Sequence, residues 1–201
     1  MTRGAVRVEF VKGEGRRYRS RLHRADGVVV EFEGGAWNKV GGRPGELPHD
    51  LAHLIVEDEL GLREGVWGVL AAGGMFRHAT VVAGRRAPQA TRRGRDVIDE
   101  AGDDIMQAEI LTRVVCDACA GALAPAPGGS RRAAAEHAPD PAALRRAAGE
   151  RWWDDALTTA ALDRCRERLR AAAAEWAALA PGAALEAAWS HAAPARPAKR
   201  R

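Results

Sequence analysis

The sequence lacks any apolar run that could cross a membrane, and it has few cysteines. No run approaches the roughly 18 apolar residues that a membrane span needs, and the segment 1–10 contains no apolar stretch of the kind found in secretory signals. Three cysteines without an export signal indicate reduced thiols rather than disulfides. We therefore expect a cytoplasmic protein with no membrane partner.

Lysine and aromatic residues are also scarce. Lysine occurs only at Lys12, Lys39 and Lys199, so arginine makes up most of the 31 basic residues. This bias toward arginine, alanine and glycine is typical of a GC-rich bacterial genome and carries no functional signal. The 27 acidic residues leave a net charge of +4, and a small net charge of mixed signs indicates an ordinary solvated surface over most of the chain.

Two arginine-rich runs depart from this mixed pattern. Arg16–Arg24 lies in a predicted strand and Arg85–Arg95 in a predicted loop, and both could follow the phosphates of a nucleic acid. Tyr18 is the one aromatic residue among them, so stacking on bases has little support. A solvated protein face is the simpler interpretation, and weak nucleic-acid binding remains an alternative.

The stretch Pro48–Leu60 carries the clearest chemical signal. Proline is tolerated in the first turn of a helix and Gly61 suits the position after its last turn, so the stretch predicts a helix. His49 and His53 are one turn apart and share one face. Apolar residues occupy the other sides: Leu51, Leu54 and Ile55. A helix that is apolar on several sides is central rather than superficial, so both histidines are expected to be half-buried.

The order His49-Asp50-x-x-His53 resembles the HExxH helix of zincin metalloproteases, with aspartate in place of glutamate. The resemblance implies His49 and His53 as zinc ligands and Asp50 as the catalytic carboxylate. The aspartate side chain is one methylene shorter, which withdraws its carboxylate by about 1.5 Å, and a misplacement of about 1 Å can cost on the order of 100-fold in rate. The motif therefore predicts a zinc site that is weak or inactive in catalysis, and a metal-dependent hydrolase if it is active.

A third metal ligand has to come from outside the histidine pair. Glu57 lies about 12 Å along the helix axis from His49, so we expect it to hydrogen-bond a histidine ring instead of binding the metal. Glu100 is the expected third ligand, because Glu100-x-x-x-Asp104 resembles the distal glutamate motif of some zincins.

Cysteine ligands, or no metal at all, are the alternatives. Cys116 and Cys119 form a single CxxC, and both thiols could complete a tetrahedral structural site with His49 and His53. The simpler interpretation is that the cysteines are small apolar side chains on a helix, and that the histidines are satisfied at the edge of the core.

The segment Leu47–Met75 resembles a group of short bacterial proteins of uncharacterised activity. The resemblance is carried by its Pro-His-Asp-Leu-x-His opening and by its Gly-Val-Trp-Gly continuation, which begins at Gly65. It implies no activity, substrate or cofactor.

The N-terminal region predicts an α+β domain over residues 1–124. Apolar residues alternate in Ala5–Val11, Arg16–Arg24 and Val28–Glu33, which predicts a three-stranded antiparallel sheet with one dry face. The helix at 48–60 is expected to cover that face. The remaining expected pieces are a loop over 34–47, a short helix over 64–72, a loop over 83–95 and a long helix over 96–124.

The C-terminal region predicts a linker followed by a helical segment. Residues 125–139 are rich in alanine, proline and glycine, residues 140–182 are expected to be helical, and the basic tail 183–201 is expected to be frayed. Apolar residues of the helical segment follow a heptad spacing: Leu162, Cys165, Leu169, Ala172, Trp176 and Leu179. This face either docks on the rest of the chain or forms a homodimer through Leu162, Leu169 and Trp176, which would make the protein a non-enzymatic interaction module.

Overall fold

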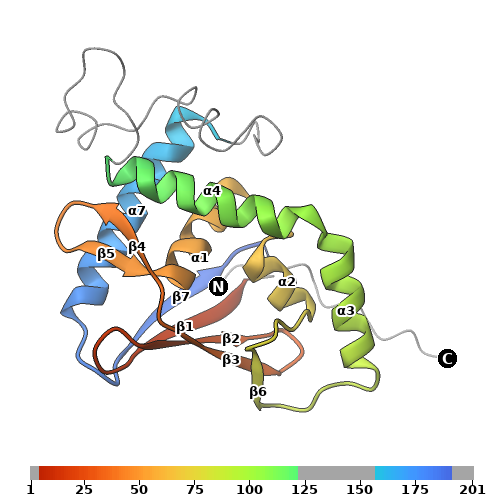
Figure 1. Cartoon of the computed structure of the whole chain (residues 1–201). Helices are drawn as coiled ribbons and strands as arrows, with labels where there is room; N and C mark the ends of the chain where they lie inside the picture. The colour runs from red at the N-terminus through yellow and green to blue at the C-terminus, as the bar shows by residue number, and fades with distance from the viewer. Residues whose placement is uncertain (1–4, 122–156, 192–201) are drawn as a thin grey trace.

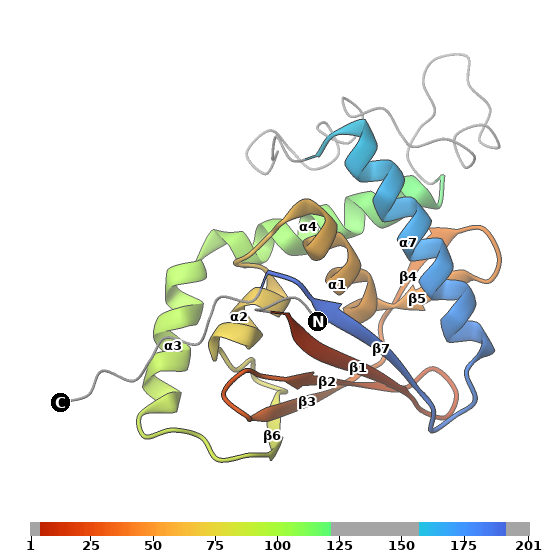
Figure 2. The same cartoon turned by 180° about the vertical axis from the view of Figure 1, so that it is seen from behind.

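A computed structural model describes residues 5–121 and 157–191 of the chain, and it has the expected α+β architecture (Figure 1). One antiparallel sheet forms the base of the molecule, and helices cover its inner face (Figures 1 and 2). The linker predicted over 125–139 and the first part of the helical segment predicted over 140–182 lie outside the described residues. No helix of the described ranges is both long and apolar enough to traverse a bilayer.

The sheet has five strands in the order β6-β3-β2-β1-β7, so the prediction of three strands is wrong in extent. The strands are β1 (Val6–Lys12), β2 (Tyr18–His23), β3 (Val29–Gly34), β6 (Thr80–Ala83) and β7 (Ala184–Trp189). The three predicted strands are β1, β2 and β3, and their alternating apolar residues do point into the core. Two further strands extend the sheet at its edges.

Strand β7 lies inside the segment that was expected to be a frayed tail. It pairs antiparallel with β1, in a register that places Trp189 beside Val6 and Leu185 beside Phe10. Leu185 and Trp189 alternate toward the inner face and are buried. The expectation for residues 183–201 is therefore wrong over 184–189, because two large apolar side chains at even spacing are enough to hold this alanine-rich strand on the sheet.

A small hairpin replaces the loop expected over 34–47. It consists of β4 (Trp37–Gly41) and β5 (Gly45–Pro48), which pair antiparallel and lead directly into the first helix. Val40 and Leu47 are fully buried, so the hairpin adds to the core despite the high glycine content that indicated a loop.

The helices are α1 (His49–Leu60), α2 (Val66–Ala72), α3 (Ala90–Ala101), α4 (Asp103–Cys119) and α7 (Thr159–Ala178). The single long helix expected over 96–124 is instead broken at Gly102, between α3 and α4. Gly102 adopts φ 50° and ψ −122°, a conformation that glycine enters far more easily than other residues. Helix α3 begins at Ala90, inside the predicted loop. The break at Gly102 lets α4 turn across the top of α1 (Figure 1).

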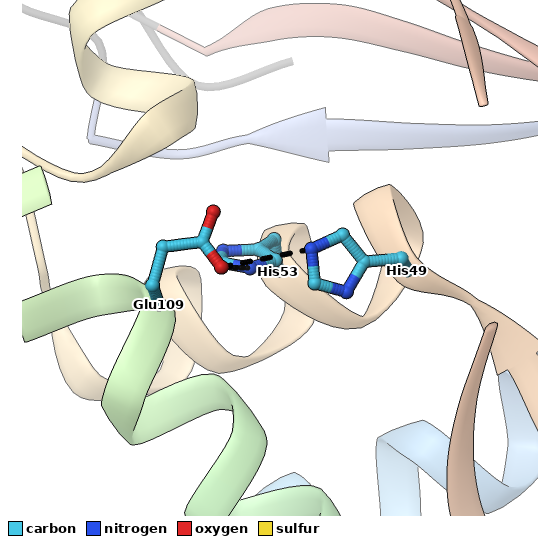
Figure 3. Close-up of side chains that lie close together, drawn as sticks. All are labelled: His49, His53 and Glu109. Atoms are coloured by element: carbon cyan, nitrogen blue, oxygen red, sulfur yellow. Dashed lines mark hydrogen bonds and ion pairs between the residues drawn. The ribbon is translucent and has the colours of Figure 1, made fainter. Parts of the chain in front are cut away.

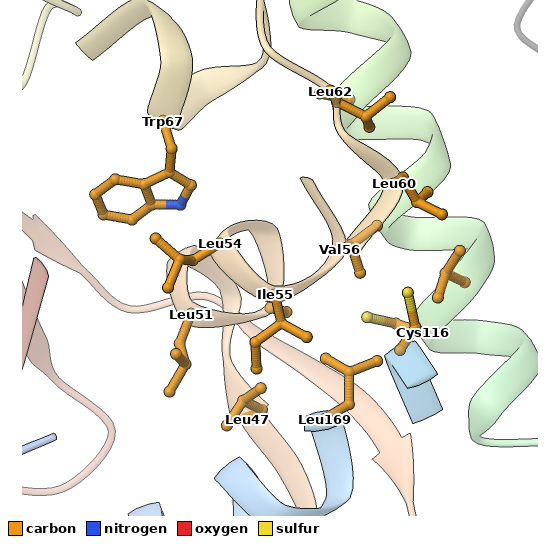
Figure 4. Packing of buried hydrophobic residues seen from close by; sticks show 14 of the residues in the cluster. Leu47, Leu51, Leu54, Ile55, Val56, Leu60, Leu62, Trp67, Cys116 and Leu169 are labelled. Carbon is orange, nitrogen blue, oxygen red and sulfur yellow. The ribbon is translucent and has the colours of Figure 1, made fainter. Parts of the chain in front are cut away.

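Helix α1 is the centre of the packing, as its apolar pattern predicts. It lies between the sheet and the helices α4 and α7 (Figures 1 and 2). Figure 4 shows Leu51, Ile55 and Val56 of α1 pointing toward different neighbours, with Leu169 of α7 and Cys116 of α4 closing the core around them. His53 and Glu57 are buried on the same helix, so two ionisable side chains lie inside the core.

Helix α7 docks on the rest of the chain through its heptad face. Leu162, Leu169 and Trp176 are 1%, 0% and 2% exposed within this chain. They therefore face the chain's own core and offer no surface for the homodimer considered above. Arg168 joins the helix to α1 through Asp58 at 2.8 Å and Glu59 at 2.7 Å. Partial burial raises the pKa of Glu59, but its hydrogen bonds from Arg168 and Arg164 outweigh that effect and hold the pKa below its usual value.

Lys12 of β1 closes the C-terminal end of α7, which has no basic residue in its own last turn. Its Nζ donates to the carbonyl oxygens of Trp176 at 2.9 Å and Leu179 at 2.7 Å. A cation at this end satisfies free carbonyls and interacts favourably with the helix dipole. We expect Lys12→Met to lower the free energy of unfolding by roughly 1–3 kcal/mol in urea titrations.

Lys39→Met is the matched control for this prediction, because Lys39 is exposed on β4 and should cost no more than about 0.5 kcal/mol. Equal stability of the two variants would show that Lys12 contributes nothing to holding α7.

Candidate metal centre

Two histidines of α1 and one glutamate of α4 converge on one point (Figure 3). Glu109 Oε2 lies 3.2 Å from His53 Nε2 and 3.7 Å from His49 Nε2. One ligand atom from each residue lies within 4.8 Å of the others, and the two imidazole rings are 4.5 Å apart between centroids. Among the residues described, this is the one group of histidine, cysteine and carboxylate ligand atoms close enough to hold a metal ion.

Each imidazole ring is fixed from behind by an oxygen acceptor. His53 Nδ1 lies 2.9 Å from Glu57 Oε1, and His49 Nδ1 lies 2.9 Å from Asn38 Oδ1. A ring that donates from Nδ1 in its neutral form presents the lone pair of Nε2, and such hydrogen bonds orient most metal-binding histidines. Both lone pairs would then point toward the carboxylate of Glu109.

Glu57 holds its position through the start of α2. Its Oε1 accepts from the backbone N–H of Val66 at 3.1 Å, and its Oε2 accepts from that of Trp67 at 3.0 Å. Gly65 makes this approach possible, because a Cβ there would lie 2.5 Å from Glu57 Oε2. Glu57 is thus behind His53 and not among the ligand atoms, as the helix spacing predicts.

The pKa values of His53, Glu109 and Glu57 depend on one another and on burial. Burial lowers the pKa of His53, but its hydrogen bonds with Glu109 and Glu57 outweigh that effect and bring the pKa to about 9. Hydrogen bonds from both histidines hold the pKa of Glu109 well below its usual range, while burial raises the pKa of Glu57. A metal ion at Nε2 would take the place of the proton between His53 and Glu109, while the Nδ1 proton would stay on the side of Glu57.

Asp50 does not reach the centre, so the structure gives no support to its expected catalytic role. Its Oδ2 accepts a hydrogen bond from the hydroxyl of Ser20 at 2.8 Å, and its backbone N–H points to the Tyr18 hydroxyl at 3.4 Å. Burial raises the pKa of Asp50, partly offset by Ser20 and the histidines. The next position along a helix is turned by about 100°, which places this carboxylate over β2.

Glu109 takes the place expected for Glu100. Glu100 is exposed near the end of α3, on the far side of the break at Gly102. Glu109 lies two turns into α4, between the fully buried Ala108 and Thr112. The sequence offers one signal for Glu109, which is an acidic residue at the margin of a buried helix face. If residues 96–124 are taken as one continuous helix, its approach to α1 cannot be seen.

The cysteines belong to the core and not to the metal centre. Cys116 and Cys119 are buried and lie outside the described ligand group. Burial raises the pKa of Cys116 to about 12 and that of Cys119 to about 11. Their place outside the ligand group favours the interpretation of these residues as apolar side chains.

The centre opens to solvent on one side. The side chains of His49 and Glu109 are 31% and 44% exposed, whereas that of His53 is 2% exposed. Two imidazole nitrogens and a carboxylate oxygen are a donor set that suits zinc and other divalent transition metals. Three protein ligands with an exposed side leave room for water or another small ligand at the remaining position.

Comparison with known proteins assigns the chain to no family. No model of a protein family, no curated protein and no solved structure matches it. The interpretation of the centre therefore depends on the geometry of its own residues.

Proposed function

We propose that this protein binds one divalent transition metal ion, with zinc as the first candidate, through His49, His53 and Glu109. One observation supports the proposal most. Both Nε2 atoms face the same carboxylate oxygen, while both Nδ1 atoms have oxygen acceptors behind them. The two glutamates alone would account for a buried, charged His53. They do not account for a second imidazole directed at the same oxygen.

Binding is the function that the geometry favours over catalysis. A three-ligand zinc ion can lower the pKa of a bound water or polarise a carbonyl group. Hydrolysis in zincins also uses a carboxylate as general base, and Asp50 is engaged by Ser20 instead. We therefore assign Asp50 to anchoring α1 on the sheet, and propose a metal ion that joins α1 to α4.

Elemental analysis of protein purified without an affinity tag tests the proposal. We expect about one zinc per chain, as for a single three-ligand site. His49→Ala and Glu109→Gln should each abolish it, because three protein donors would become two. These positions are preferred to His53, because His49 and Glu109 are partly exposed and their variants should still fold. Added zinc should raise the melting temperature of the metal-free protein but not that of the variants.

The sequence offers matched controls. Glu100→Gln removes an exposed carboxylate of the neighbouring helix, and the double variant Cys116→Ser, Cys119→Ser removes the alternative thiol ligands. Both should keep their zinc. A protein that takes up no transition metal, or that keeps it in both His49→Ala and Glu109→Gln, would refute the site.

A further inference from the structure

Arginine side chains collect at the corner where β6 leads into α3. We call this surface the arginine corner, and Figures 1 and 2 show its two elements joined by one loop at the edge of the molecule. It comprises Arg85, Arg86, Arg92, Arg93 and Arg95. All are exposed except Arg86, which is half-buried.

These arginines lack acidic partners among the residues that the structure describes, whereas several arginines of the sheet have them. On the strands, Arg7 pairs with Glu9 at 2.7 Å, and Arg21 pairs with Glu31 on the next strand. No arginine of the corner forms an ion pair with any residue in the described ranges. Of the two arginine-rich runs in the sequence, the strand run is therefore partly neutralised and the corner keeps its positive charge.

The charged residues of α3 are arranged unfavourably with respect to the helix dipole. The basic residues Arg92, Arg93 and Arg95 occupy its first half, whereas Asp96, Asp99 and Glu100 occupy its second half. Helices are normally stabilised by the opposite arrangement. The first turn also has no acidic residue and no side-chain cap. The positive end of its dipole and its arginines thus add to one positive potential at the corner.

The loop before α3 adds a place where an anion can fit. A surface hollow of about 520 Å³ is lined by Arg85, Arg86, Ala87 and Pro88. Guanidinium groups bind phosphate oxygens through paired hydrogen bonds. The corner has more arginines than one phosphate group can engage, which favours a ligand with repeated phosphates.

We propose that the arginine corner binds the phosphate backbone of nucleic acid without reading its sequence. The corner contains no aromatic residue on which a base could stack, so recognition is limited to phosphates. A membrane surface is less well matched, because Val82 is the one large apolar side chain exposed at the corner, and interfacial segments insert several. This proposal is independent of the metal centre.

Binding of a mixed-sequence DNA duplex of about 20 base pairs tests the proposal. We expect measurable affinity at about 50 mM salt, and a steep loss of affinity by about 200 mM. The triple variant Arg85→Gln, Arg92→Gln, Arg95→Gln should weaken binding at least about tenfold and reduce the salt slope by about 2–3. Arg93 is left in place because it donates to the carbonyl oxygen of Pro88 at 2.7 Å.

The triple variant Arg17→Gln, Arg19→Gln, Arg63→Gln is the matched control, since it removes the same charge from exposed positions elsewhere. It should bind within about twofold of the unaltered protein. If both triple variants weakened DNA binding equally, the effect would depend only on net charge, and the proposal would be overturned. Binding to phosphatidylserine vesicles without binding to the duplex would overturn it in favour of a membrane surface.

Discussion

Replacing Glu57 by alanine is expected to lower the free energy of unfolding by about 3–5 kcal/mol. This carboxylate is fully buried and accepts hydrogen bonds from the His53 ring and from the backbone N–H groups of Val66 and Trp67. Alanine would leave all three donors without an acceptor in a place that water reaches poorly. The penalty for buried, unpaired polar groups adds to the loss of the charge partner of His53.

Urea unfolding of the metal-free protein measures this effect without a contribution from zinc. Glu57→Gln keeps the shape but has only one acceptor oxygen, so its loss should be smaller than that of Glu57→Ala. Glu64→Ala, at an exposed position in the loop before α2, should change stability by no more than about 0.5 kcal/mol. A Glu57→Ala protein as stable as Glu64→Ala would mean that the buried carboxylate holds neither His53 nor α2 in place.

Trp176→Ala should cost about 3–5 kcal/mol, as for other buried aromatic residues truncated to alanine. Trp176 is 2% exposed, and it contacts the rings of Tyr18 and Trp37 edge to face. Its Nε1 has no hydrogen-bond partner among the described residues, so the expected loss comes from packing and from the contact of Lys12 Nζ with the ring at 5.8 Å. The sequence places it in the last turns of a helix whose other faces are polar.

Glu175→Ala is the control for Trp176, because the neighbouring side chain is exposed and its loss should be nearly neutral. Light scattering should find the same mass for the two variants and the unaltered protein, since the heptad face is used inside the chain. A dimer that Trp176→Ala converts into an equally stable monomer would contradict this docked arrangement.

The parts of the fold that the sequence predicts are those with regular local patterns. Strands β1 to β3 alternate over most of their length, and α1 has a clear beginning and end, so both were predictable from neighbouring residues. Strand β7 was not, because Glu186, Ala187 and Ala188 lie between Leu185 and Trp189 and leave only a weak alternation of apolar and polar residues. Its stability comes from pairing with β1, a partner that sequence spacing cannot reveal.

The candidate site likewise has a part that the sequence predicts and a part that it does not. His49, His53 and Glu57 lie on one helix, so their mutual geometry follows from helical periodicity. Glu109 reaches them only because the chain turns at Gly102 and α4 packs across α1. Asp50 is the reverse case, because the sequence predicts it at the site and the structure places it elsewhere. The motif alone predicts that the Asp50 side chain lies at the metal, whereas in the structure it accepts a hydrogen bond from the hydroxyl of Ser20 on β2.

The pairing of β1 with β7 has a consequence for the order of events during synthesis. Arg7 and its partner Glu186 on the adjoining strand are 179 residues apart in the chain. In the folded sheet β1 has β2 on one side and β7 on the other, so without β7 its second edge has no partner in this sheet. Unpaired strand edges are templates for association with other chains. The free edge of β1 can therefore be covered by its own chain only after residues 184–189 have been synthesised.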